Sequence, residues 1–203
     1  MRPRAVVFDV LGTLVHDPFE EEMAAFFGMS REEFLQALRP GVWPRFERGE
    51  IGEEDFVRSM FRDGRAFDLP AFKAMLQGAW RWLDGMKALV RALAGTGLPL
   101  HLCSNYPVWY RDLESCLRLS RWLRWTFVSC EHRMRKPDPA VFERTARLAR
   151  LPPEALLFVD DRTGNCEAAR RMGFQALPFA GAPALARELA RLGLLSSDSL
   201  PQG

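Results

Sequence analysis

Residues 4–14, RAVVFDVLGTL, decide the fold, because an apolar run ends there at an aspartate and a glycine turn. Four consecutive apolar residues, Ala5–Phe8, are typical of a strand that is buried on both faces of a parallel sheet. Asp9 follows at once, and Gly12-Thr13 predicts a tight turn. We therefore expect Asp9 to stand at the carboxyl end of a buried strand, where parallel sheets bind their ligands.

Outward from this stretch, strand-like and helical segments alternate. Apolar runs at 98–103, 125–129, 155–159 and 174–179 are separated or followed by helical patterns at 86–94, 109–119, 140–150, 165–172 and 183–192. Such alternation implies right-handed crossovers between parallel strands. The fold class predicted is α/β, a doubly wound parallel sheet with helices on both faces.

The segment from residue 17 to residue 85 has a different character, with helical patterns and almost no strand signal. Helices are expected from Asp17 to Gly28, after the capping box Ser30–Glu33, after Gly52 and after Leu69. We predict a core of residues 1–16 and 86–203 with a small α-helical cap, residues 17–85, inserted into it. Trp43, Trp80 and Trp82 fit the core of the cap, a substrate pocket or a dimer contact, and the sequence does not decide among these. The tail after residue 195 is expected to fray.

The composition excludes several classes of protein. A net charge of +2, left by 28 basic and 26 acidic residues, favours neither a nucleic acid nor a membrane surface as partner. The chain contains no apolar run long enough to span a membrane, and its start does not resemble a signal peptide. Cysteines 103, 116, 130 and 166 lack metal-site spacing and are expected to be buried free thiols of a cytoplasmic protein.

Polar groups follow several of the predicted strands and should meet at one edge of the sheet. These groups are Asp9, the Ser104-Asn105 pair and the Asp160-Asp161 pair. Each alone also fits a turn or a helix cap. Together, the three carboxylates would repel one another unless a cation joins them, and hard oxygen ligands suit Mg²⁺. Lys136, within RKPDP, supplies a point charge for a nucleophile and a phosphoryl oxygen. The pattern indicates phosphoryl transfer through an aspartyl phosphate.

Four motifs give the chain a resemblance to a known family: FDVLGTL at 8–14, LCSN at 102–105, RKPDP at 135–139 and FVDDRTGN at 158–165. The chain resembles the haloacid dehalogenase-like (HAD) hydrolase superfamily with a C1-type helical cap and a HAD-like Rossmannoid core. The resemblance implies the following roles: Asp9 and Lys136 catalytic; Thr13, Ser104, Asn105 and Lys136 at the phosphate; and Asp9, Asp160, Asp161 and the backbone carbonyl of Leu11 at Mg²⁺.

Leu11 departs from the family pattern, because phosphatases of this family have a second acid there that protonates the leaving alcohol. Such help is worth about 10²–10⁴-fold in rate, so its loss is costly but not prohibitive. We predict a Mg²⁺-dependent hydrolase of a small phosphorylated metabolite, with His16 as one candidate for the missing proton donor. Two alternatives remain: a 2-haloacid dehalogenase, whose halide leaves without a proton, and a HAD-fold non-catalytic binding or regulatory protein. The sequence leaves the oligomeric state open.

Overall fold

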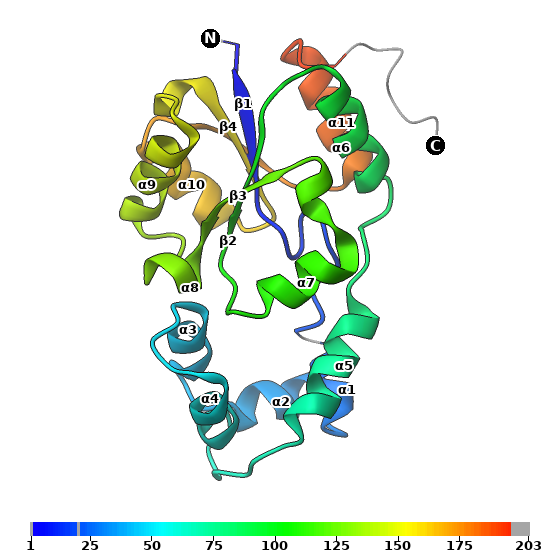
Figure 1. Cartoon of the computed structure of the whole chain (residues 1–203), viewed down its shortest axis with the longest axis vertical. Coiled ribbons are helices and arrows are strands. Elements are labelled where there is room, and N and C mark those ends of the chain that lie inside the picture. Colours follow the sequence, from blue (N-terminus) through cyan, green and yellow to red (C-terminus); the bar gives the residue numbers. More distant parts are fainter. Residues whose placement is uncertain (1, 20, 196–203) are drawn as a thin grey trace.

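The computed structural model describes residues 2–19 and 21–195. Its centre is a five-stranded parallel sheet (Figure 1). The strands are β1 (Ala5–Phe8), β2 (Leu100–Ser104), β3 (Arg124–Val128), β4 (Leu156–Asp160) and β5 (Gln175–Pro178), in the spatial order β3-β2-β1-β4-β5. β1 is central, and all of its residues are buried, as expected for a strand covered on both faces. The predicted doubly wound parallel sheet is confirmed.

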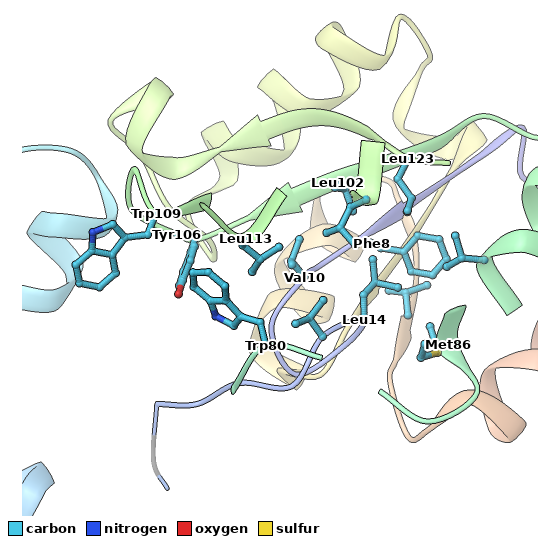
Figure 2. Packing of buried hydrophobic residues seen from close by; sticks show 14 of the residues in the cluster. Phe8, Val10, Leu14, Trp80, Met86, Leu102, Tyr106, Trp109, Leu113 and Leu123 are labelled. Carbon is cyan, nitrogen blue, oxygen red and sulfur yellow. The ribbon is translucent and has the colours of Figure 1, made fainter. Parts of the chain in front are cut away.

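Helices cover both faces of this sheet. On one face lie α6 (Met86–Gly95) and α11 (Ala182–Arg191), and on the other α9 (Pro139–Ala149) and α10 (Thr163–Arg171) (Figure 1). Successive side chains of β1 point to opposite faces of the sheet. Val6 and Phe8 pack toward α6 and α11, whereas Val7 packs toward α9 and α10. Figure 2 shows Phe8, Leu102 and Met86 within the first of these two cores. Short 3₁₀ turns at Leu119–Arg121 and Pro153–Ala155 lead into β3 and β4.

Between β1 and α6, the described residues form five helices: α1 (Glu22–Phe26), α2 (Arg31–Ala37), α3 (Val42–Glu47), α4 (Glu53–Ser59) and α5 (Leu69–Ala79). They gather at one end of the molecule beyond the sheet, and α3 lies beside α8 (Ser129–His132) (Figure 1). Their interior is aromatic. Trp109, just before α7 (Tyr110–Leu117), extends toward these helices (Figure 2). The centroid of its ring lies 5.6 Å from that of Phe56. The boundaries of the cap at residues 17 and 85 stay a prediction.

The chain enters and leaves this helical end through two segments that pair with each other. The His16 amide donates to the carbonyl of Arg81 at 2.9 Å, and the Leu83 amide donates to the carbonyl of Leu14 at 2.9 Å. Val15 faces the second segment in an antiparallel bridge. The pairing holds the start of the helical segment next to the turn that follows Asp9.

Two local predictions were wrong, and one helix was not predicted. The first helix begins at Glu22 rather than Asp17, because the Asp17 carboxylate accepts the Phe19 amide at 3.1 Å and forms a turn instead. Helix α3 was not among the expected helices; its proline, Pro44, is the third residue, where a backbone N–H would have no partner within the helix. Residue 129 begins α8 rather than ending a strand.

The four cysteines are free thiols, but they are not uniformly buried. Cys103 and Cys166 are buried as predicted, whereas Cys116 is exposed and Cys130 is partly exposed. Within the part of the chain that is described, no helix combines the length and apolar character needed to traverse a bilayer. The cytoplasmic location stays a prediction. The tail expected to fray, residues 196–203, lies outside the described residues.

Candidate active site

The carboxyl ends of β1, β2 and β4 bring the predicted polar groups together. Asp9 directly follows β1, Ser104 is the last residue of β2 and Asp160 the last of β4. Asp9 and Ser104 face a cavity of about 140 Å³ that lies between the sheet edge and the helical end, whereas Asp160 is fully buried behind it. Its lining consists of Asp9, Leu11, Asp17, Phe19, Trp43, Glu47, Ser104, Asn105, Tyr106, Arg135, Lys136, Arg162 and Asn165.

Lys136 is the electrostatic centre of the site. Its side chain is 1% exposed, and its ammonium lies 2.7 Å from Asp9 Oδ1 and 2.6 Å from Asp160 Oδ2. Burial alone would lower the pKa of Lys136, but the carboxylates of Asp160 and Asp9 raise it above its usual range, so the ammonium is retained. One buried cation therefore links the nucleophile candidate of β1 to the acid at the end of β4.

Asn105 positions this lysine. Asn105 Oδ1 accepts the Lys136 backbone N–H at 2.8 Å, and Asn105 Nδ2 donates to the Lys136 carbonyl at 2.9 Å. Both ends of the amide are thus engaged with one residue from the loop before α9. The asparagine predicted at the phosphate lines the cavity, and its direct contribution in the structure is to hold the backbone of Lys136. Its role toward phosphate stays a prediction.

The Asp160 carboxylate accepts hydrogen bonds from several groups of the protein. Besides the ammonium of Lys136, it accepts the Arg162 amide at 2.9 Å, and both of its oxygens accept Asn165 Nδ2, at 2.9 and 3.0 Å. Asn165 is therefore a site residue that was not among the predicted candidates, although it closes the motif at 158–165.

Asp161 differs from Asp160 because it is exposed and is held by the turn after β1. Its amide donates to Thr13 Oγ1 at 3.1 Å, and the same hydroxyl faces Asp161 Oδ1 at 3.5 Å. Gly12 has φ +80°, and a Cβ there would lie 2.8 Å from the Asp161 carboxyl group. Only glycine permits both this backbone conformation and this close approach. Thr13 is fully buried, and its hydroxyl serves Asp161; a phosphate contact from Thr13 stays a prediction.

Asp9, Asp160 and Asp161 form an acidic cluster in which each offers a carboxylate oxygen within 4.8 Å of the others. Burial raises the pKa of Asp9, and the nearby carboxylates of Asp160 and Asp161 raise it further, against the opposing effect of Lys136. Burial likewise raises the pKa of Asp161, with Asp160 adding to the effect. When all three carboxylates are ionised, they exceed the one ammonium by two negative charges, which is the charge that a divalent cation would neutralise.

Neither Leu11 nor His16 supplies an acid to this cavity. Leu11 lines it with an apolar side chain. His16 is not among its lining residues, and its Nε2 is engaged with Glu22 Oε1 at 2.6 Å. The structure therefore gives no support to His16 as the replacement for the missing acid.

The helical end contributes a wall that the motifs did not predict. Trp43, for which the sequence left both a cap core and a substrate pocket open, lines the cavity next to Phe19, with ring centroids 5.2 Å apart. Glu47, which is 6% exposed, accepts the indole N–H of Trp43 at 2.9 Å and the Arg135 side chain at 2.7 Å. Its carbonyl also accepts the hydroxyl of Ser129 at 2.5 Å, which ties α3 to the start of α8.

Comparison with known proteins identifies the family. A family model described as haloacid dehalogenase-like hydrolase matches residues 3–173. Because this match spans most of the chain, the protein belongs to the haloacid dehalogenase-like hydrolases, and the resemblance drawn from the four motifs is confirmed.

Relatives with particular activities are found within that family. Flavin mononucleotide hydrolase 1 of Arabidopsis thaliana, named as chloroplastic, is 40% identical over 189 residues, covering 93% of this chain and 77% of that protein. Phosphoglycolate phosphatase 1 of Pseudomonas aeruginosa is 28% identical over 190 residues, covering 84% of this chain and 67% of that protein. A HAD family enzyme from Bacteroides thetaiotaomicron, solved with magnesium and inorganic phosphate, has a TM-score of 0.67 at 19% identity, covering 88% of this chain and 94% of that one, and so shares the fold.

Proposed function

We propose that this protein is a Mg²⁺-dependent phosphatase of small phosphate monoesters that works through an aspartyl phosphate on Asp9. One observation carries the proposal: the Asp9 carboxylate lies 2.7 Å from the buried ammonium of Lys136, beside two further carboxylates, at the mouth of a cavity. A carboxylate placed in this way is a nucleophile for phosphorus, and its cationic neighbour offsets the charge of the incoming phosphoryl group.

In the proposed reaction, a carboxylate oxygen of Asp9 attacks phosphorus, and the ester oxygen leaves with the bonding electron pair. Water then attacks the phosphorus of the acyl phosphate, which releases inorganic phosphate and restores Asp9. Lys136 orients the nucleophile and neutralises phosphoryl oxygens, while Ser104, at the end of β2, offers its hydroxyl to the same group. Asn105 keeps Lys136 in place.

The acidic cluster fits a bound Mg²⁺. The carboxylates of Asp9, Asp160 and Asp161 would hold the ion together with the backbone carbonyl of Leu11. Mg²⁺ bound there would neutralise the charge that the carboxylates and a phosphate bring together. Asp160 is already occupied by several protein donors, so the exposed Asp161 supplies the less encumbered ligand.

The cavity supports a small substrate. Its volume of about 140 Å³ is well below the roughly 300–1,000 Å³ of pockets for drug-sized ligands. It therefore holds a phosphoryl group with a short organic part, and a ligand as large as flavin mononucleotide requires the helical end to move outward. Phosphoglycolate and flavin mononucleotide, named in the two relatives, are the first compounds to test.

Both alternatives rest on Leu11. For a dehalogenase, Leu11 is suitable because halide leaves without a proton, and for a binding protein, because Leu11 cannot act as the second acid. Against a dehalogenase stands the acidic cluster, since Asp160 and Asp161 would add repulsion to a site that requires no metal. Against a non-catalytic binding protein stands the complete set of buried contacts around Lys136.

The experiment is a panel of phosphate esters and 2-haloacids, each assayed with Mg²⁺ and with a chelator, for the wild type and for Asp9→Asn. Release of phosphate that the chelator and Asp9→Asn both abolish supports the proposal. Asp55→Asn, a change of an exposed acid on α4, is the matched control and retains activity. Chelator-resistant release of halide would favour the dehalogenase. Silence in both assays, with tight binding of a partner, would favour the binding protein.

A further inference from the structure

A phosphatase that acts on alkyl esters needs a proton for its leaving alkoxide, and Leu11 cannot donate one. The acids that line the described cavity besides Asp9 are Asp17 and Glu47. Both line the same cavity as Asp9, so their own contacts decide between them.

Glu47 is committed to holding the helical end in place. Its Oε1 accepts the indole N–H of Trp43, and its Oε2 accepts the side chain of Arg135. A proton on Glu47 would have to displace one of these two donors, and removing it from Arg135 would leave that cation without its carboxylate. Burial raises the pKa of Glu47, but both of its oxygens are occupied.

One carboxylate oxygen of Asp17 is available for a further hydrogen bond. Its Oδ1 accepts the Phe19 amide at 3.1 Å, and for Oδ2 no hydrogen-bond partner is present among the residues that the structure describes. The residue lies directly after the paired segments that join the core to the helical end, next to the hydrogen bond between His16 and Arg81. The backbone just before Asp17 is therefore anchored to the core.

Asp17 also lies between the cavity and the surface. Besides lining the cavity that contains Asp9, it lines a second, more open hollow together with Asp161 and Arg162. A carboxyl group in this place can exchange protons with solvent on one side and face a bound ester on the other.

The surroundings of Asp17 favour its protonated form more than ordinary solvent does. Burial raises the pKa of its carboxyl group, and the nearby Asp161 raises it further. The Phe19 amide, Arg162 and His16 act in the opposite direction, and the net direction is upward.

We propose that Asp17 is the general acid and base of this enzyme and replaces the acid that Leu11 lacks; the proposal rests on the phosphatase function proposed above. As Asp9 forms its bond to phosphorus, the P–O bond of the ester breaks, and the ester oxygen takes a proton from Asp17. The Asp17 carboxylate then accepts a proton from the water that attacks the acyl phosphate. This second step returns Asp17 to its protonated form, releases phosphate and leaves Asp9 free.

The test compares esters whose leaving groups differ in their need for a proton. The kcat/KM value reports the first chemical step, so Asp17→Asn should lower it by about 10²–10⁴-fold for an alkyl phosphate. For p-nitrophenyl phosphate, whose leaving group departs as an anion, the loss should be under about 3-fold. The second step should slow for both esters, so the variant should release a burst of one p-nitrophenolate per active site. His16→Gln is the matched control and should leave both kcat/KM values unchanged.

A second substitution that restores activity distinguishes the loss of a proton donor from a structural defect in Asp17→Asn. Leu11→Asp, added to Asp17→Asn, should restore at least about 10-fold of the lost kcat/KM on the alkyl ester. In the wild-type background, the same Leu11→Asp change should bring a gain under about 3-fold, because an acid is already present. This second measurement holds even if Asp17→Asn fails to fold.

Three results would overturn the proposal: equal losses on the alkyl and aryl esters, no loss on either, or a gain above about 10²-fold from Leu11→Asp alone. Failure of the proposed phosphatase function would give a different result. The wild-type enzyme would then release phosphate from no ester, or the Asp9→Asn variant would still release it. Either result would contradict both proposals.

Discussion

Replacing Lys136 with methionine tests the electrostatic account of the site most severely. The substitution keeps the length and apolar stem of the side chain but removes the ammonium that lies 2.7 Å from Asp9 and 2.6 Å from Asp160. Three carboxylates within 4.8 Å of one another, Asp161 included, then have no cationic side chain between them.

The magnitude follows from the distances. At an effective dielectric constant of about 20, two carboxylates 4.8 Å apart repel by about 3.5 kcal/mol, and an ammonium 2.7 Å from a carboxylate attracts it by about 6 kcal/mol. The variant relieves part of this cost by taking up protons or cations. We therefore expect a loss of about 3–5 kcal/mol in the free energy of unfolding at neutral pH, as for other buried ion pairs that lose one partner.

The loss should depend on pH. Without Lys136, burial and the neighbouring carboxylates raise the folded-state pKa of Asp9 above the unfolded value with no cation to oppose them. A group of this kind loses stability as pH rises through its folded pKa, so the deficit is largest at neutral pH and shrinks as pH falls through that pKa. Added Mg²⁺ should also restore part of the stability, because it binds the folded state alone.

Urea denaturation followed by tryptophan fluorescence measures these differences. The matched control is Lys73→Met, because Lys73 also contacts two acids, Glu53 at 3.1 Å and Asp112 at 2.8 Å, but with 29% of its side chain exposed. It should lose no more than about 1 kcal/mol. A loss for Lys136→Met that is as small as the control's, or that is the same at all pH values, would refute the reasoning.

Three further predictions concern neighbouring residues. Gly12→Ala places a Cβ 2.8 Å from the Asp161 carboxyl group and strains the backbone at φ +80°, so Mg²⁺ activation should weaken by at least about 10-fold, measured from activity against Mg²⁺ concentration. Asn165→Ala leaves both oxygens of Asp160 without one donor and should lower the free energy of unfolding by about 1–3 kcal/mol in urea titrations. For alkyl esters, kcat/KM should fall as pH rises through the raised pKa of Asp17, and a flat profile would contradict that role.

The fold was predictable because its signals are local. The strands β1 and β4 are short apolar runs stopped by an aspartate, and alternation with helices leaves a parallel sheet as the natural arrangement. The end of each strand then places Asp9, Ser104 and Asp160 at one edge, without any knowledge of side-chain geometry. Helix α3 was not among the helices expected from the sequence, and the structure shows that its proline, Pro44, lies in the first turn, where proline is tolerated.

The division of labour within the site was not predictable from the sequence. Asp160 and Asp161 are adjacent and chemically identical in sequence, yet one is buried among donors and the other is exposed beside Gly12. Likewise, nothing in the motifs distinguishes Asp17 from His16, since the distinction depends on which side chain lines the cavity. Glu47 belongs to no motif, and it reaches the site only because α3 packs beside α8.

The central claim is that a divalent cation binds among the carboxylates of Asp9, Asp160 and Asp161. Calorimetric titration of Mg²⁺ into the protein, with and without a phosphate mimic such as vanadate, tests it most directly. The account predicts uptake of a single Mg²⁺ per chain, tighter with the mimic present and weakened at least about 10-fold by Asp161→Asn. An absence of uptake under both conditions, or uptake that Asp161→Asn leaves undiminished, would contradict it.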